Sequence, residues 1–195
     1  MGTVILFVLG VISLICFNPM TTAFTYGPTP FWHKVLTILT HMISHGSLEH
    51  LLGNYLFGFP YMLYLEYRLK STVKFLWLFF VFGLASLVAQ MISNYFSFFP
   101  GMGMIGSSGA IFGIVGAALF LKKENTFATI VSRLLALFFI LTQAQMTYAT
   151  LIFPDGVAYA AHLGGLLSGT YFSLRHRPHR RRRKSRRSRP SRSRK

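Results

Sequence analysis

Acidic residues are scarce in this sequence of 195 residues, which contains only four Asp and Glu side chains. Charged residues of all kinds make up 12% of the chain, whereas a soluble domain carries roughly a quarter. Hydrophobic residues account for 52%, and the mean hydropathy is +0.48. This composition excludes an ordinary soluble protein and favours an integral membrane protein, and the length suits one domain.

Cysteine is almost absent as well, because Cys16 stands alone in an apolar run. A single cysteine excludes an internal disulfide framework and leaves the redox compartment undetermined. The N-terminus lacks the basic residues that open a secretory signal, and no small-residue cleavage site precedes Asn18. We therefore expect the first apolar segment to be a helix of the folded protein.

Positive charge is abundant but unevenly distributed. Of the 20 Lys and Arg residues, 13 lie between Arg175 and Lys195, in a segment rich in Arg and Ser. Like charges at this density repel one another, so residues 175–195 are predicted to be a disordered basic tail. Its place beside an apolar segment favours contact with anionic lipids. No aromatic or folded readout module accompanies the charge, so nucleic acid is not an expected partner.

Six apolar segments are predicted to be the helices of an all-α membrane bundle. They cover residues 3–17, 48–65, 73–95, 107–121, 128–153 and 157–174. Several are shorter than the ~20 residues that a crossing needs, and we expect the short fourth segment to be enclosed by the others. The long connection at residues 18–47 is predicted to be a partly folded segment at the outer membrane interface.

The charges between the segments predict the orientation of the bundle. Basic clusters follow the second, fourth and sixth segments. With six crossings, these clusters all lie on one side of the membrane, which the positive-inside rule makes cytoplasmic. Both termini are therefore predicted to be cytoplasmic, with residues 1–174 forming the membrane domain.

Two reactive side chains lie within the apolar segments. Ser108 is in a Gly-Ser-Ser-Gly run at 106–109, and His162 is near the start of the last segment. A polar group at bilayer depth is costly and indicates a functional site. A serine beside a histidine can act as a nucleophile, and the free N–H groups of a helix start attract developing negative charge. We predict a dyad rather than a triad, because Asp155 lies nearer the water.

Small residues predict that the fourth and sixth segments pack closely. Gly109 and Gly113 form one Gly-x-x-x-Gly face, and Gly165 and Gly169 form the other. Such faces let two helix backbones approach each other, which would bring the serine hydroxyl within reach of the histidine ring. Helix packing alone also explains these small residues, and a structural hydrogen bond also explains a lone histidine.

The second segment contributes further polar groups. His50 and Asn54 are four residues apart and share one helix face, and both can donate hydrogen bonds to an oxyanion. A metal site is the alternative, and its ligands would be His41, His45, His50 and His162. The spacing is not that of an HExxH helix, and no carboxylate base accompanies these histidines.

Together these motifs resemble the rhomboid family of intramembrane serine proteases, in its short bacterial form with six helices. The resemblance covers nearly the whole chain up to the tail. The run at 106–109 matches the family's GxSG motif and implies that Ser108 is the nucleophile. The stretch at 161–169, with its histidine and two spaced glycines, matches the family's last helix and implies that His162 is the base.

The resemblance also implies roles for other residues. His50 and Asn54 match the family's HxxxN motif, whose side chains join the backbone N–H of the serine in the oxyanion hole. His41 and His45 keep the family's spacing before that motif, where a histidine braces the first loop. Supporting roles are implied for Gly106, Gly109, Gly165, Gly169, His45, Glu66 and Arg68.

Two positions depart from the family's pattern. The first loop contains Trp32-His33 where the family often has Trp-Arg, and Phe112 stands where a tyrosine commonly packs on the catalytic histidine. Phenylalanine can still stack on the ring of His162 but lacks the hydroxyl. The orientation of the base is therefore the feature that this departure affects.

The resemblance implies a serine endopeptidase of the bacterial cytoplasmic membrane, without a metal or another cofactor. Its substrates would be single-span membrane proteins that approach between the second and fifth segments and are cut in or next to the membrane. Polar residues of the fifth segment would line a water-filled cavity or bond other helices. A catalytically silent relative that binds client helices is the alternative; a small transporter is disfavoured by the absence of an inverted repeat.

Overall fold

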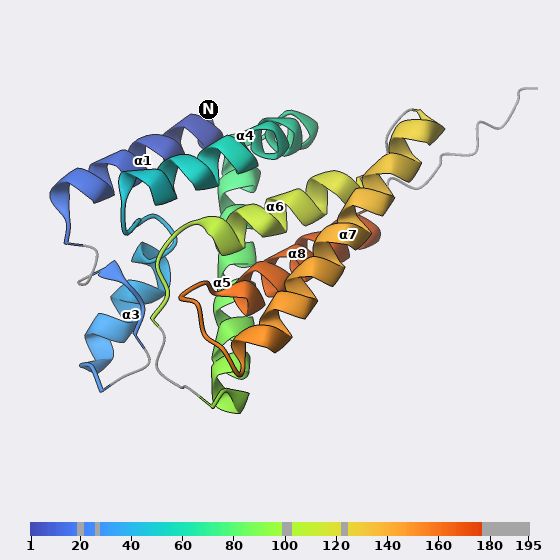
Figure 1. Ribbon diagram of the computed structural model, residues 1–195. Coiled ribbons are helices and arrows are strands. Elements are labelled where there is room, and N and C mark those ends of the chain that lie inside the picture. Colours follow the sequence, from blue (N-terminus) through green and yellow to red (C-terminus); the bar gives the residue numbers. More distant parts are fainter. Residues whose placement is uncertain (19–21, 26–27, 99–102, 122–124, 177–195) are drawn as a thin grey trace, which may run out of the picture.

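The computed structural model describes residues 1–18, 22–25, 28–98, 103–121 and 125–176. Within these ranges the chain forms seven helices (Figure 1). They are α1 (Gly2–Cys16), α3 (Phe31–Thr40), α4 (Leu48–Leu69), α5 (Thr72–Phe96), α6 (Ser108–Phe120), α7 (Thr126–Thr150) and α8 (Tyr159–Arg175). Across the same ranges, the β-structure is an isolated antiparallel bridge between Phe24 and Met104. The protein is therefore all-helical in the part that the structure describes.

Helix α6 lies at the centre of the bundle, between α4 and α8 (Figure 1). Ten of its 13 residues are buried, and nearly all of them are small or apolar, so neighbouring helices can surround it. A helix of this length spans about 20 Å, which is less than the thickness of the hydrocarbon layer. The enclosure of the short fourth segment agrees with the sequence-based expectation.

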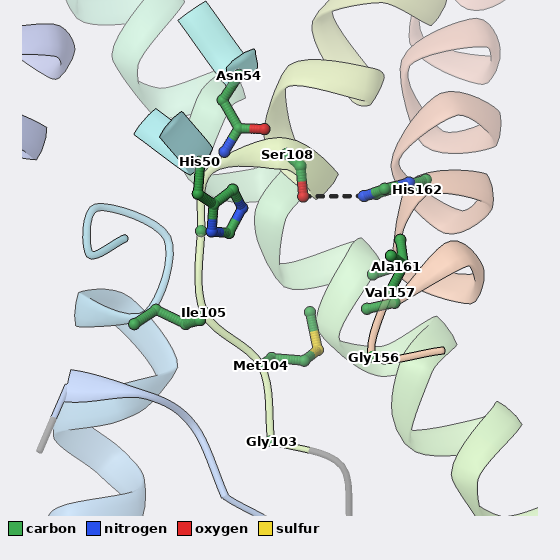
Figure 2. A pocket seen from close by; sticks show the side chains of 12 residues that line it. His50, Asn54, Gly103, Met104, Ile105, Ser108, Gly156, Val157, Ala161 and His162 are labelled. Carbon is green, nitrogen blue, oxygen red and sulfur yellow. Dashed lines mark hydrogen bonds between the residues drawn. The ribbon is translucent and has the colours of Figure 1, made fainter. Parts of the chain in front are cut away.

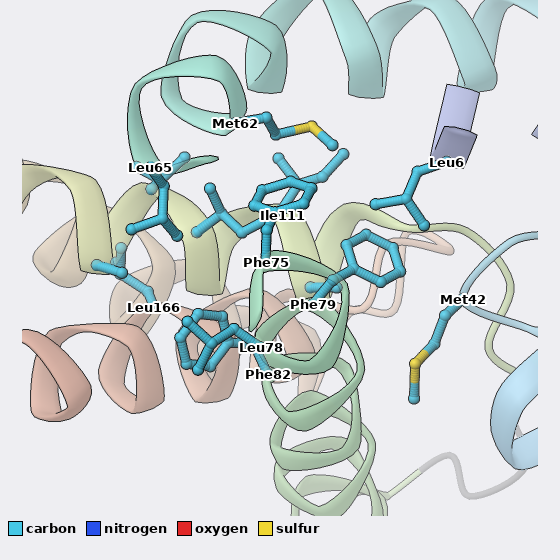
Figure 3. Close-up of a cluster of buried hydrophobic side chains, with 14 of the residues drawn as sticks. Leu6, Met42, Met62, Leu65, Phe75, Leu78, Phe79, Phe82, Ile111 and Leu166 are labelled. Carbon is cyan, nitrogen blue, oxygen red and sulfur yellow. The ribbon is translucent and has the colours of Figure 1, made fainter. Parts of the chain in front are cut away.

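Phenylalanine side chains of α5 form the middle of the core. Phe75, Phe79 and Phe82 follow one another on one face of the helix and have almost no exposed surface. They belong to the same cluster as Ile111 of α6 and Leu166 of α8 (Figure 3). Because lipid is as apolar as these side chains, the contacts stabilise the bundle through close packing. This core holds α6 and α8 in place beside each other.

Glycines bring α6 and α8 almost into backbone contact. A Cβ atom at Gly165 would overlap the carbonyl oxygen of Gly109, and one at Gly169 would overlap the carbonyl oxygen of Gly113. The two Gly-x-x-x-Gly faces found in the sequence therefore pack against each other. Their close approach sets the distance between the helices that begin near Ser108 and His162.

We expect Gly169→Ala to destabilise the protein, because its methyl group would force α6 and α8 apart. Overpacking of this kind costs about 1–3 kcal/mol. Gly53→Ala is a matched control, since a Cβ there meets nothing within 4 Å. Thermal unfolding in detergent micelles should give a lower midpoint for Gly169→Ala and an unchanged or higher midpoint for Gly53→Ala. Equal midpoints for the two variants would contradict the packing account.

Two of the described helices, α5 and α7, are long and apolar enough to cross a membrane by length and composition. Helices α1 and α6 are shorter apolar helices. The six crossings and the cytoplasmic position of both termini stay predictions. In helix α7 Ala136 is the one buried residue, and about half of the side chains are exposed.

Helix α4 continues four residues beyond the predicted end at residue 65 and ends at Leu69. Glu66 and Arg68, the charged residues that suggested an earlier end, both make hydrogen bonds. Glu66 accepts hydrogen bonds from the backbone N–H groups of Gly2 (2.7 Å) and Thr3 (3.1 Å), and so caps the start of α1. Arg68 donates to the hydroxyl of Tyr64 one turn earlier. Glu66 and Arg68 therefore make hydrogen bonds that stabilise the fold near the end of α4.

The long first connection contains a helix, which fits the partly folded segment predicted for it. Residues 31–40, for which a partly folded segment was predicted, form the regular helix α3. Pro30 precedes its first turn, where a missing N–H has no cost. Of the predicted basic tail at 175–195, only Arg175 and His176 lie within the described residues.

Candidate active site

Ser108 is the first residue of α6 and follows a tightly held loop. Gly106 has a φ of +113°, a conformation that favours glycine, and its N–H donates to the carbonyl of His41 (2.8 Å). A Cβ at Gly106 would also lie 2.7 Å from Cε1 of His50. Glycine at 106 is therefore required both by the turn and by the ring beside it.

His45 holds the loop before α6 through a hydrogen bond to Ser107. His45 Nδ1 donates to the carbonyl of Ile43 (2.9 Å), which leaves Nε2 to accept from the hydroxyl of Ser107 (3.0 Å). Ser107 is fully buried. His45, for which the resemblance implied a role in bracing the first loop, thus bonds the residue immediately before Ser108.

His162 reaches Ser108 from α8. Its Nε2 lies 2.9 Å from the hydroxyl oxygen of Ser108 (Figure 2). The two residues are 54 positions apart in the chain, and the close packing of α6 against α8 brings them together. This is the distance at which a histidine can remove the proton of a nucleophilic serine.

Gln143 of α7 contacts the other nitrogen of the ring. His162 Nδ1 lies 3.1 Å from Gln143 Oε1. With that oxygen as the acceptor, Nδ1 carries the hydrogen and Nε2 has the free lone pair that faces the serine. Asp155 does not take this place, because its carboxylate accepts from the N–H of Val157 (2.9 Å) and the hydroxyl of Tyr159 (3.1 Å). In this structure Asp155 is therefore not the partner of His162 Nδ1.

Phe112 packs on the face of the same ring. The centroids of Phe112 and His162 are 4.5 Å apart, and the two rings are inclined by 15°. The stacking contact expected of a phenylalanine at this position is thus present. A stack fixes the plane of the imidazole, but it makes no hydrogen bond to either ring nitrogen.

A cavity of about 450 Å³ opens beside Ser108. Figure 2 shows His162 on one side of the serine and His50 and Asn54 of α4 on the other. The Nδ2 atom of Asn54 is buried and has no hydrogen-bond partner among the described residues. A buried donor without an acceptor costs about 1–3 kcal/mol, and Asn54 Nδ2 is free to donate to a group that enters the cavity.

The four histidines of the metal alternative make other contacts. His41 Nδ1 donates to the carbonyl of Thr37 (2.6 Å), and burial lowers the pKa of this residue. His45 and His162 bond the two serines as described, and the His45 and His50 rings meet edge to face with centroids 5.3 Å apart. Among the described residues, no group of three or more metal-ligating side chains is gathered.

Two glutamines at the site were not singled out from the sequence as neighbours of the base. Gln143 is one of several polar residues of its segment, and the sequence does not distinguish it from the others. Gln90 of α5 is buried, and its Oε1 accepts from the N–H of Ala161 (3.2 Å), the residue before His162. Its Nε2 donates to Asn94 Oδ1 (2.9 Å). A polar residue in the middle of an apolar helix was the available signal for both.

Comparison with protein families gives a match to the rhomboid domain over residues 32–178. Comparison with curated proteins gives no match. The matched range includes Ser108, His162 and the two residues of α4 that border the cavity. Since the match covers well over half of the chain, the protein belongs to the rhomboid family and is an integral membrane protein.

Proposed function

We propose that the protein is a serine endopeptidase that cleaves membrane proteins in or next to their transmembrane segments. The observation that carries this proposal is the 2.9 Å contact between Ser108 Oγ and His162 Nε2. The unpartnered amide nitrogen of Asn54 beside the same cavity supports it. The match to the rhomboid domain supports a reaction that takes place in the membrane.

In the first half of the proposed reaction, Ser108 Oγ bonds to the carbonyl carbon of the scissile peptide. His162 Nε2 takes the serine proton, and the carbonyl electrons move to oxygen. We propose that this oxyanion accepts hydrogen bonds from Asn54, His50 and the backbone N–H of Ser108, which has no intrahelical acceptor at the helix start. Each such donor is worth about 3–4 kcal/mol in the transition state of soluble serine proteases.

In the second half, the tetrahedral intermediate collapses and the carbon–nitrogen bond breaks. The leaving amine takes the proton from His162 Nε2, and an acyl ester on Ser108 remains. Water then adds to the ester carbonyl while Nε2 takes its proton, the ester bond breaks, and Ser108 recovers its hydrogen. The dyad returns to its starting state without a metal or another cofactor.

The proposed substrates are single-span membrane proteins. A peptide bond within a helix is sheltered by its own hydrogen bonds, so small or helix-destabilising residues near the outer end of the span would favour cleavage. We further propose six membrane crossings, with the domain at 1–174 and both termini on the cytoplasmic side of a bacterial inner membrane. The basic residues at 175–195 would contact anionic lipids, each contributing about 1 kcal/mol.

Reconstitution tests the proposal. Purified protein and a single-span reporter with a small-residue segment near its outer end would be placed in liposomes, beside the Ser108→Ala variant. We expect site-specific cleavage of the reporter by the wild type and none by the variant. Binding of the reporter without cleavage would overturn the protease proposal and favour the silent, client-binding alternative.

A further inference from the structure

The hydrogen bond between Gln143 and His162 can decide which ring nitrogen carries the hydrogen. The stacking contact with Phe112 cannot do this. A neutral imidazole carries its hydrogen on one of two nitrogens, and only the form with hydrogen on Nδ1 can accept the serine proton at Nε2. Gln143 Oε1, 3.1 Å from Nδ1, stabilises this form. Without an acceptor at Nδ1, the hydrogen could equally lie on Nε2, where it blocks general-base catalysis.

The ring contacts of His162 with Phe112 and Tyr159 do not favour one position of the hydrogen over the other. Phe112 stacks on the ring at an inclination of 15°, and such a stack is equally good for both forms and for a ring turned over by half a rotation. Tyr159 meets the ring edge to face, with centroids 5.9 Å apart, while its hydroxyl donates to Asp155. The carboxylate nearest in sequence is thus engaged elsewhere.

Gln143 belongs to α7, a helix with little buried surface. Ala136 is the one buried residue of α7. Polar links near its two ends include Arg133 Nη2 to the carbonyl of Phe120 (2.6 Å) and, from the residue after α7, the carbonyl of Leu151 to the N–H of Phe98 (3.3 Å). Gln143 lies between these links, so the acceptor for the base is carried by an element separate from the α6–α8 pair.

We propose that Gln143 is a positioning residue for the catalytic base, which acts through its side-chain oxygen to hold His162 in the form with hydrogen on Nδ1. This inference rests on the proposed protease function. It makes the competence of the dyad depend on α7, although neither dyad residue belongs to that helix. Gln143 touches no reacting atom and acts only through His162.

Kinetics of four proteins test the inference: wild type, Gln143→Met, Gln143→Glu and Gln145→Met. Methionine keeps the length of the side chain but has no oxygen, whereas glutamate keeps an acceptor at the same place. Gln145 is an exposed residue of the same helix and serves as the matched control. We expect kcat of Gln143→Met to fall about tenfold, with KM within twofold of the wild type. Gln143→Glu should recover at least half of the wild-type kcat, and Gln145→Met should equal the wild type.

Two kinetic results would overturn the inference. One is a Gln143→Met variant with wild-type kcat. The other is an equal loss in Gln143→Met and Gln143→Glu, which would indicate a purely structural role for the glutamine.

A spectroscopic measurement separates this inference from the protease proposal. Nitrogen NMR of histidine-labelled protein reports which ring nitrogen carries hydrogen, and a His162→Asn variant identifies the His162 signals. We expect hydrogen on Nδ1 in the wild type and a mixture of forms in Gln143→Met, whether or not the protein cleaves a reporter. Identical His162 signals in the two proteins would overturn the inference, whereas a wild type with the expected signals but no cleavage would overturn only the protease proposal.

Discussion

Replacement of Ser108 or His162 by alanine is expected to abolish cleavage, with a loss of about 10⁶-fold in kcat for either variant. The two side chains act as one unit through the 2.9 Å contact between Oγ and Nε2. The double variant should therefore be no slower than either single variant. Cleavage of a single-span reporter in liposomes measures all three.

His176→Ala is a suitable control for the dyad variants, because His176 is exposed and lies beyond the end of α8. It should keep the wild-type rate. Full activity of Ser108→Ala would show that another residue is the nucleophile. Independent, multiplying losses in the two single variants would show that Ser108 and His162 do not act together.

The second large effect is expected at Asn54. Asn54→Leu removes the buried Nδ2 donor beside the cavity, and loss of one oxyanion donor lowers kcat by about 10²–10³-fold. KM should change little, because the donor contacts charge that develops only in the transition state. Initial rates over a range of reporter concentrations in the membrane separate the two parameters.

Asn54→Asp tests the same donor with little change of shape. The carboxylate side chain has the size of the amide but lacks the N–H groups, so this variant should be impaired as strongly as Asn54→Leu. A kcat within twofold of the wild type in either variant would remove Asn54 from the oxyanion hole. Unchanged thermal midpoints would exclude a loss through misfolding.

The parts of the site that the sequence predicted are those carried by short local patterns. The glycines at 109, 113, 165 and 169 indicated that two helices would pack closely, and the structure brings these faces together. That packing is enough to place Ser108 beside His162. The spacing of His50 and Asn54 likewise put both side chains on one face of α4, and both border the cavity.

The parts that the sequence did not predict depend on contacts between distant segments. Gln143 lies 19 residues from His162 on another helix, and no periodicity relates the two. Glu66 resembled the end of a membrane segment, yet it caps α1 from 63 and 64 residues away. The separation of Asp155 from the base, by contrast, was expected because this residue lies nearer the water, and its carboxylate bonds Val157 and Tyr159 instead.

The central claim is that Ser108 is an activated nucleophile whose reactivity depends on His162. The most direct test is labelling of the purified, detergent-solubilised protein with a fluorophosphonate probe, followed by identification of the modified residue. The account predicts a label on Ser108 in the wild type and no label in Ser108→Ala or His162→Ala. A folded wild type that stays unlabelled, or a His162→Ala variant that is labelled as fast as the wild type, would contradict it.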